Sequence, residues 1–287
     1  MKTRTDKTLY IVVAAAILII GGWLAPALGI DAEKSRGMAL LAASLLLWIT
    51  EALPMCISVL AMICVLPIFG IMSFDEAMGA IGVNTALFIM ASSGITVALS
   101  DSSVPELILN RIFIRMKDRP YIIVILTGLS AALFSAFMSS LAVCVLYTGI
   151  IGSFLEKNDM KTRSCALGRA LMMSIPACAG IGGFMSPAGT PGNILIMDLL
   201  ARSGYQITFT QWCVIGFPAG VVTALLFLMC TVLIFKPAKP EFTHIEDDKK
   251  SLTGKDRLII TIILLIIAGW FLSGWIESFN ITIVSIF

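Results

Sequence analysis

Two clusters of small polar and helix-breaking residues lie inside the most apolar part of this chain. The first is the serine-rich stretch 135–141, SAFMSSL, and the second is the stretch 184–197, FMSPAGTPGNILIM. Hydroxyl and carbonyl oxygens are hard ligands of the kind that a sodium ion prefers, and the open N-terminus of a broken helix attracts anions. Together the clusters predict one binding site for sodium and a small anion, built from backbone dipoles and small polar side chains.

The candidate binding residues come from both clusters and from a glycine just before the second. Ser135 and Ser139 are spaced i, i+4, so a helix would place both hydroxyls on one face. The candidate sodium- and anion-binding residues are Ser135, Ser139, Ser140, Gly183, Gly189, Thr190, Pro191 and Asn193. A structural reading stays open, because glycine and proline in membrane helices also serve close packing or a kink. The occurrence of two such clusters close together favours the binding site.

The reactive side chains give little support to an enzyme. The only histidine, His244, lies in a charged loop, which excludes a histidine-based triad or a multi-histidine metal site within one chain. The seven cysteines show no C-x-x-C spacing and are expected to be buried small hydrophobes. Four acidic residues near predicted span ends are expected to be interfacial or capping groups: Glu51, Asp101, Glu106 and Asp198. We therefore expect no enzymatic activity, no catalytic residue and no metal centre.

The composition indicates that lipid is the solvent of this protein. Of its 287 residues 58% are hydrophobic and 13% charged, with a mean hydropathy of +0.97, whereas soluble domains are about a quarter charged. The net charge of +2 gives no reason to expect a nucleic-acid partner. The apolar segments that we expect to enter the membrane are 8–30, 37–53, 55–72, 84–101, 121–155, 164–202, 211–236 and 257–277.

Charge determines the expected course of the longest segments. The positive-inside rule places the clusters of basic residues in the cytoplasm, including those on both sides of 121–155. That segment is therefore expected to be a re-entrant hairpin with its tip near 135–141. The N-terminus is then cytoplasmic, in a protein integral to the cell membrane. On the far side lie only three of the 20 basic residues, Lys34, Arg36 and Arg202.

Segment 164–202 is expected to cross the membrane as a discontinuous helix. Its break should leave free N–H groups at one end and free carbonyls at the other, as in the ion and substrate sites of secondary carriers. The glycines Gly180, Gly182 and Gly183 are placed within this break, because they permit unusual φ angles, and Pro187 and Pro191 remove donors there.

Three stretches resemble the divalent anion:sodium symporter family, the carriers of dicarboxylates, citrate and sulfate. WITEALPMCISVLAMICVLPIFGI (48–71) resembles an early run of that family, and FMSSLAVCVL (137–146) lies where the family has a Ser-Asn-Thr motif at a hairpin tip. GGFMSPAGTPGN (182–193) resembles its G-T-P-P-N loop, with Gly192 in place of the second proline. Ser139 matches the motif serine, whereas Ser140 stands at the asparagine position and Leu141 at the threonine position. The identity of the anion therefore stays open.

The resemblance implies an all-α polytopic membrane protein with the fold of an inverted-repeat secondary transporter, truncated after the first repeat. Residues 1–36 would hold the N-terminus and first transmembrane helix, 37–236 the first repeat, 237–256 a cytoplasmic linker, and 257–287 the start of a second repeat. The function implied is sodium-coupled symport of a small anion, with sodium as coupling ion and movement of an elevator type. A homodimer or a complementary second half is the expected partner. The alternatives are an inactive or partner-dependent half-transporter and a related ion antiporter.

Overall fold

The protein is helical throughout the part of the chain that the computed structural model describes, which is residues 4–24, 29, 31–79, 83–160, 165–238, 242, 252–273 and 284. The chain divides into two compact units, Met1–Val83 and Asn84–Phe287. Each unit has its own cluster of buried apolar side chains. This architecture confirms the all-α membrane fold that the family resemblance implies.

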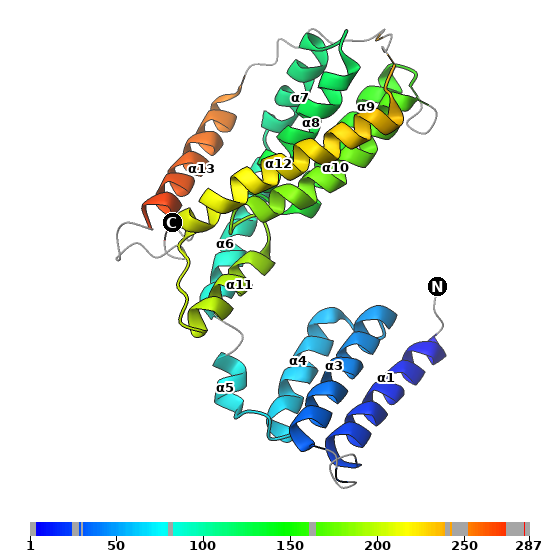
Figure 1. Ribbon diagram of the computed structural model, residues 1–287, viewed down its shortest axis with the longest axis vertical. Coiled ribbons are helices and arrows are strands. Elements are labelled where there is room, and N and C mark those ends of the chain that lie inside the picture. The colour runs from blue at the N-terminus through cyan, green and yellow to red at the C-terminus, as the bar shows by residue number, and fades with distance from the viewer. Residues whose placement is uncertain are drawn as a thin grey trace. The chain divides into compact units, whose positions relative to one another are not determined.

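The first unit is built from four α-helices and a π-helical turn in the part of the chain that the structure describes (Figure 1). Its elements are α1 (Arg4–Ile19), the π-helical turn η1 (Ile20–Leu24), α3 (Ala32–Thr50), α4 (Met55–Ile68) and α5 (Phe74–Gly79). Helix α3 begins after Asp31, whose carboxylate accepts a hydrogen bond from the N–H of Glu33 at 3.1 Å. It ends at Glu51, which has a left-handed backbone with φ 50°. Glu51 is thus a helix-capping residue, as expected.

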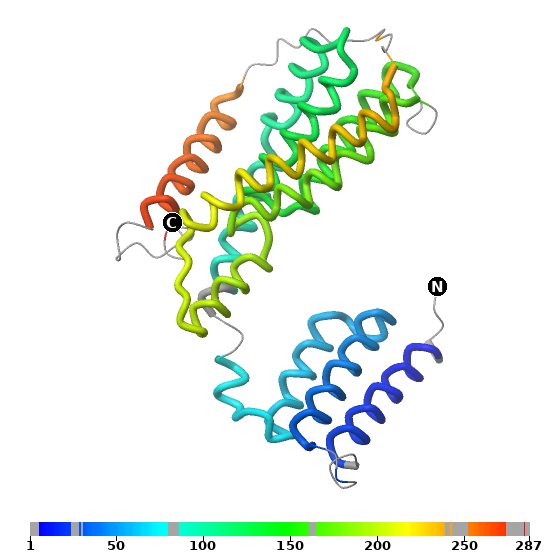
Figure 2. Tube along the Cα trace, in the orientation of Figure 1, coloured from blue at the N-terminus to red at the C-terminus, as the bar shows by residue number. Residues whose placement is uncertain are grey.

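The second unit contains the two segments that the sequence predicts to be broken. Its elements are α6 (Val83–Ser100), α7 (Val104–Arg115), α8 (Pro120–Ser135), α9 (Ser140–Lys157), α10 (Ala166–Met185), α11 (Pro191–Arg202), α12 (Phe209–Phe235) and α13 (Gly254–Leu272). Helix α10 lies at the centre, alongside α8 and α12 (Figures 1 and 2). The rings of Phe113, near the end of α7, and Phe154, near the end of α9, stack at 4.2 Å. Helix α9 therefore returns to the side from which α8 starts, as a hairpin does.

Small residues let the central helices approach closely. A Cβ atom on Gly128 of α8 would lie 2.5 Å from the Leu228 side chain of α12 and 3.1 Å from the Cys178 sulfur of α10. A Cβ atom on Gly182 of α10 would collide with the backbone of Ala132 in α8. Without a hydrophobic driving force between helices in lipid, such close contacts are what membrane helices use to associate.

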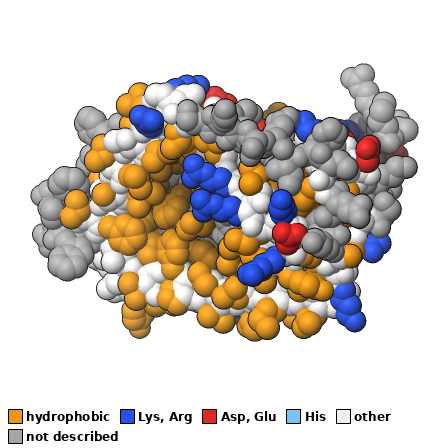
Figure 3. Space-filling view, turned by 90° about the horizontal axis from the view of Figure 1, so that it is seen from above, with side chains coloured by type: hydrophobic (Ala, Val, Ile, Leu, Met, Phe, Trp, Pro, Cys, Tyr) orange, Lys and Arg blue, Asp and Glu red, His pale blue; other side chains and the backbone are white. Residues whose placement is uncertain are grey.

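The outward faces of the helices are apolar. On α12 the exposed side chains include Val214, Ile215, Leu226, Leu233 and Ile234. Hydrophobic side chains also form a broad area on the face shown in Figure 3. A soluble protein rarely exposes so large an apolar surface, so these faces are suited to contact lipid.

Four helical segments in the described residues are long and apolar enough to cross a membrane: Asp6–Trp23, Ser140–Lys157, Ala166–Met185 and Phe209–Phe235. The pair α6 and α7, bent by 49°, would add a fifth as one broken span. Helix α8 is apolar but shorter. The break between α8 and α9 lies inside the predicted tip, while the re-entrant course of 121–155 through the membrane stays a prediction.

Other predicted boundaries are not tested by the fold. Much of the predicted linker 237–256 lies outside the described residues, as does most of the chain after Ser273. Within 257–287 the structure describes α13, which ends at Leu272. The division into a first repeat, a linker and a second repeat stays a prediction.

Asp256 fixes the start of α13 to the corner between α6 and α7. Its carboxylate accepts hydrogen bonds from the Thr253 hydroxyl at 2.7 Å, the Ser103 N–H at 3.0 Å and the Thr253 N–H at 3.0 Å. These bonds, that of the Thr253 hydroxyl foremost, lower the pKa of Asp256 from 3.8 to about 2. The residue precedes the predicted span 257–277, so an aqueous change of pH should reach it.

We expect Asp256→Ala to lower the melting temperature at neutral pH and to have little effect in strong acid. A carboxyl group whose pKa is lowered by folding stabilises the fold above its unfolded pKa, and this contribution is lost as the pH falls through the folded value. The difference from the wild type should therefore shrink between about pH 4 and pH 2. Thermal melting in detergent measures it, with the exposed neighbour changed in Lys255→Ala as control. A difference independent of pH would contradict a role for the carboxylate charge.

Candidate functional site

The tip of the hairpin is held by the hydroxyl of a buried serine. Helix α8 ends at Ser135 and α9 begins at Ser140, so residues 136–139 form the break. The Ser135 hydroxyl donates to the Ala179 carbonyl oxygen of α10 at 2.6 Å and lies 2.9 Å from the Ser140 hydroxyl, with which it shares a hydrogen bond. Because Ser135 is completely buried, these contacts attach the tip firmly to α10.

The second break, residues 186–190, separates α10 from α11. Ser186 has an extended backbone, and its hydroxyl donates to the Ala136 carbonyl oxygen in the hairpin tip. The Asn193 side-chain amide donates to the carbonyl oxygens of Gly183 at 2.9 Å and Ser186 at 2.7 Å. Asn193 therefore folds the start of α11 back onto the end of α10.

The break differs from the expectation in two respects. Gly180, Gly182 and Gly183 lie within the regular helix α10, and none of them has a positive φ. Packing explains two of them, since Gly182 lies against Ala132 and a Cβ on Gly183 would collide with the Ser140 hydroxyl, whereas a Cβ on Gly180 would meet no atom within 4 Å. The carbonyls at the end of α10 are not all free either, because Asn193 donates to those of Gly183 and Ser186.

The two breaks are in direct contact. A Cβ atom on Gly189 would lie 2.6 Å from the Gly183 carbonyl oxygen and 2.6 Å from the Ser135 carbonyl oxygen. Both oxygens thus lie beside the same point on the chain, one from α10 and one from the end of α8. Side-chain-free backbone at position 189 is what permits this approach.

Two helix N-termini open near this contact. Ser139 is the N-cap residue of α9 and Thr190 that of α11, and neither side chain accepts a capping hydrogen bond from its helix. The aligned peptide dipoles give the N-terminus of each helix a partial positive charge, which favours an anion.

A cavity of about 140 Å³ lies where the hairpin tip, the second break and α6 meet. The described residues that line it carry no charge. They are Phe88, Ile89, Ser92, Ser93 and Thr96 of α6, Ser139 of the tip, Pro187, Ala188, Gly189 and Thr190 of the break, and Pro191 and Ile194 of α11. The Ser139 N–H donates to the Thr96 hydroxyl at 3.2 Å, which connects the tip to α6.

The structure divides the predicted site residues into two groups. Ser139, Gly189, Thr190 and Pro191 line the cavity. Ser135, Ser140, Gly183 and Asn193 lie in the contact between the breaks and do not line it.

Sequence reasoning missed the wall supplied by α6. Ser92, Ser93 and Thr96 form a short polar run in the middle of the apolar segment 83–100, and that run was the available signal. Residues i and i+4 share a helix face, so Ser92 and Thr96 point the same way.

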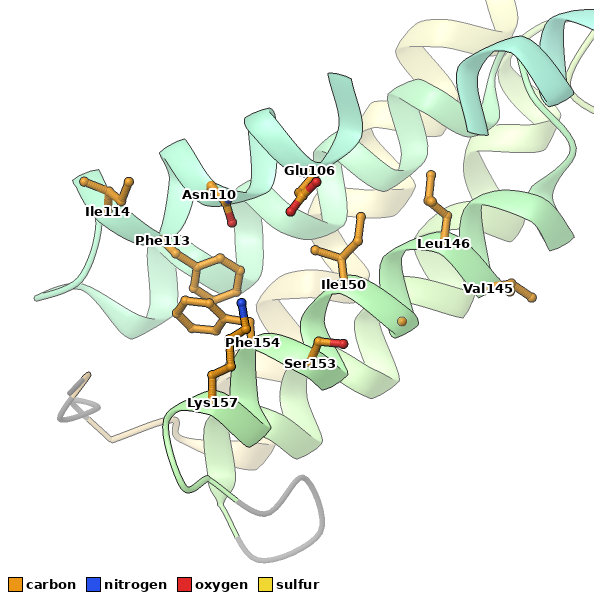
Figure 4. A pocket seen from close by; sticks show the side chains of 11 residues that line it. Glu106, Asn110, Phe113, Ile114, Val145, Leu146, Ile150, Ser153, Phe154 and Lys157 are labelled. Carbon is orange, nitrogen blue, oxygen red and sulfur yellow. The ribbon is translucent and has the colours of Figure 1, made fainter. Parts of the chain in front are cut away.

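A larger cleft, of about 490 Å³, lies between α7 and α9 (Figure 4). Its polar lining includes Glu106, Asn110 and Lys157, and each of these already has an interaction partner. None of the break residues lines it. The smaller cavity at the breaks is therefore the candidate binding site.

The oxygen chemistry of this region suits sodium better than a transition metal. The described residues contain no group of three or more histidine, cysteine, aspartate or glutamate side chains that could hold a metal ion. The contact between the two breaks offers serine and threonine hydroxyls and backbone carbonyls, which are ligands of hard cations.

Comparison with known proteins shows that the chain is similar to several transporters. Residues 45–285 match the family model described as citrate transporter. An inorganic phosphate transporter (PHO87) of Saccharomyces cerevisiae is 24% identical over 86% of this chain and 28% of its own length. An uncharacterized transporter of Haemophilus influenzae is 26% identical, over 87% of this chain and 53% of its own length. The sodium-dependent dicarboxylate transporter SdcS of Staphylococcus saprophyticus is 24% identical, over 80% of this chain and 44% of its own length.

The chain thus spans between about a quarter and about half of the length of these relatives. The dicarboxylate transporter among them confirms the resemblance to divalent anion:sodium symporters that the three stretches indicate. Because the family match covers most of the chain, including both breaks and the cavity, this membrane protein belongs to the citrate transporter family.

Proposed function

We propose that this protein is a sodium-coupled symporter of a small di- or multivalent anion of the dicarboxylate, citrate or sulfate class. The observation that carries the proposal is the convergence of two uncapped helix N-termini, those of α9 and α11, on one cavity. Partial positive charge from both helices favours an anion at this place. The name of the dicarboxylate transporter relative, which is sodium-dependent, supports the same class.

Charge balance supports coupling to a cation. The described lining of the cavity is uncharged, and an anion in such surroundings is unfavourable without a compensating charge. The carbonyl oxygens of Ser135 and Gly183, which lie beside Gly189, and the nearby hydroxyl of Ser140 would hold sodium. Sodium at this contact would lie next to the anion and reduce its cost of burial.

The movement that we propose is that of a rigid body formed by the hairpin and the broken helix. Hydrogen bonds from Ser135 to Ala179 and from Ser186 to Ala136 tie the two elements together. The partner in this proposal is a second copy of the chain or a complementary second half. In this proposal the N-terminus lies in the cytoplasm. Reporter fusions at the N-terminus and in the loop 237–253 test this, because the two reporters should lie on the same side of the membrane.

Thermal melting of the purified full chain in detergent tests binding. Sodium and potassium are compared at equal ionic strength, with succinate, citrate, sulfate and phosphate added in turn. A ligand that binds the folded state raises the melting temperature by mass action. We expect a sodium-specific rise that one of these anions enlarges.

Ser139→Ala removes an N-cap hydroxyl that lines the cavity, and we expect it to abolish the anion-dependent rise. Thr148→Ala is the matched control, because the Thr148 hydroxyl donates within its own helix to the Cys144 carbonyl at 2.7 Å. Uptake of the binding anion into proteoliposomes then tests transport itself. A well-folded protein that shows no selective shift would contradict the proposal and favour the inactive or partner-dependent half-transporter.

A further inference from the structure

Helix α6 presents a buried hydroxyl that the fold leaves without a partner. The Ser92 oxygen is inaccessible to solvent and makes no hydrogen bond among the described residues. Ser92 lines the cavity at the breaks. A buried hydroxyl without a hydrogen-bond partner is energetically unfavourable. In native proteins a bound ligand or an ordered water usually supplies the hydrogen bond that the chain itself does not.

The neighbouring hydroxyls on α6 are committed, which singles out Ser92. The Ser93 hydroxyl donates to the Ile89 carbonyl oxygen at 2.8 Å. The Thr96 hydroxyl accepts from the Ser139 N–H at 3.2 Å and donates to the Ser92 carbonyl oxygen at 3.4 Å. The Ser92 hydroxyl is therefore available to donate a hydrogen bond to another acceptor.

Two further hydroxyls line the cavity with the buried Ser92 hydroxyl: those of Ser139 and Thr190, which make no capping hydrogen bond to their helices and are less buried. They come from three separate elements, α6, the hairpin tip and the start of α11. An oxyanion has several oxygens that accept hydrogen bonds from different directions, so one such group can accept a hydrogen bond from each of these three elements.

We propose that Ser92 of α6 binds the transported anion directly, by donating a hydrogen bond to an oxygen of its carboxylate, phosphate or sulfate group. This inference rests on the proposed function, since it assigns a third wall to the same anion site. Thr96 fixes the tip to α6 beside it. The anion then contacts α6 as well as the hairpin and the broken helix, and α6 takes part in selecting it.

The test is Ser92→Ala in the full chain, measured by sodium-dependent melting with succinate, citrate, sulfate and phosphate in parallel. Since hydrogen bonds to charged groups are stronger than neutral ones, we expect the affinity for the binding anion to fall about 10- to 100-fold. Without anion, the melting temperature should stay the same or rise, because the variant removes an unpartnered buried hydroxyl. Whether the inorganic anions or the carboxylates lose affinity shows which of them Ser92 contacts.

The control is Ser174→Ala, which removes a buried hydroxyl that donates to the Leu171 carbonyl at 3.0 Å and lies away from the cavity. It should leave the anion affinity unchanged. An unchanged affinity in Ser92→Ala, with binding intact in the wild type, would overturn this inference and leave the proposed function standing. A lower melting temperature without anion, with the anion shift retained, would assign Ser92 a structural role. Absence of any anion shift in the wild type would overturn both.

Discussion

Gly189→Ala is expected to abolish sodium-dependent anion binding. The added Cβ would lie 2.6 Å from two backbone oxygens, those of Gly183 and Ser135, and backbone atoms cannot turn away as a side chain does. The second break must then move away from the hairpin tip by several tenths of an ångström or more. Overpacking of this kind costs about 1–3 kcal/mol, and here it would also displace the oxygens that are proposed to hold sodium.

A matched substitution lies three residues further along. In Gly192→Ala the added Cβ would lie 3.9 Å from the Thr190 hydroxyl, which is ordinary contact, and the position is exposed in the first turn of α11. Alanine is the better helix former by about 0.5–1 kcal/mol, so this variant should keep both stability and binding. Melting temperature and anion-induced shift are measured for both variants. Normal binding by Gly189→Ala would contradict the contact between the two breaks.

The positions of both breaks could be predicted because local chemistry determines them. The first break, 136–139, falls inside the predicted tip 135–141, where serines interrupt an apolar run. The second, 186–190, coincides with Ser-Pro-Ala-Gly-Thr, where Pro187 lacks a donor and Pro191 suits the first helical position.

Roles that depend on tertiary contact could not be predicted. The glycines at 180–183 looked like a break because glycine permits unusual φ, yet a glycine serves close packing equally well, and Gly182 does so against Ala132, 50 residues earlier. The Ser139 contact with Thr96 spans 43 residues. Periodicity on one segment carries no information about which distant face will lie against it.

The same limit explains why the sequence predicts only a membrane span for α6. Ser92 and Thr96 are common residues in membrane helices, where a hydroxyl normally bonds to its own helix. Only the fold shows that the Ser92 hydroxyl makes no such bond, and that the helix face carrying Ser92 lines a cavity together with residues of the two breaks.

Asn193→Ala is expected to destabilise the protein more than any surface change on the same helix. The variant removes both donors that bind the carbonyls of Gly183 and Ser186, and Asn193 is only 2% exposed, so water is poorly placed to replace them. Each buried carbonyl left without its partner costs about 1–3 kcal/mol. Two such losses should lower the melting temperature by roughly 5–15 °C and, because α11 would no longer be held against α10, weaken anion binding as well.

Asp198→Ala on the same helix is the control. Asp198 forms an exposed ion pair with Arg202 at 2.9 Å, and such surface pairs contribute about 0–1 kcal/mol. Asn193→Asp sharpens the test, because it keeps the shape of the side chain while placing carboxylate oxygens against the two carbonyls. It should be at least as destabilising as Asn193→Ala. If both variants had the melting temperature of Asp198→Ala, the amide of Asn193 would not hold the break together. Asn193 would then have to act by contacting the ligand.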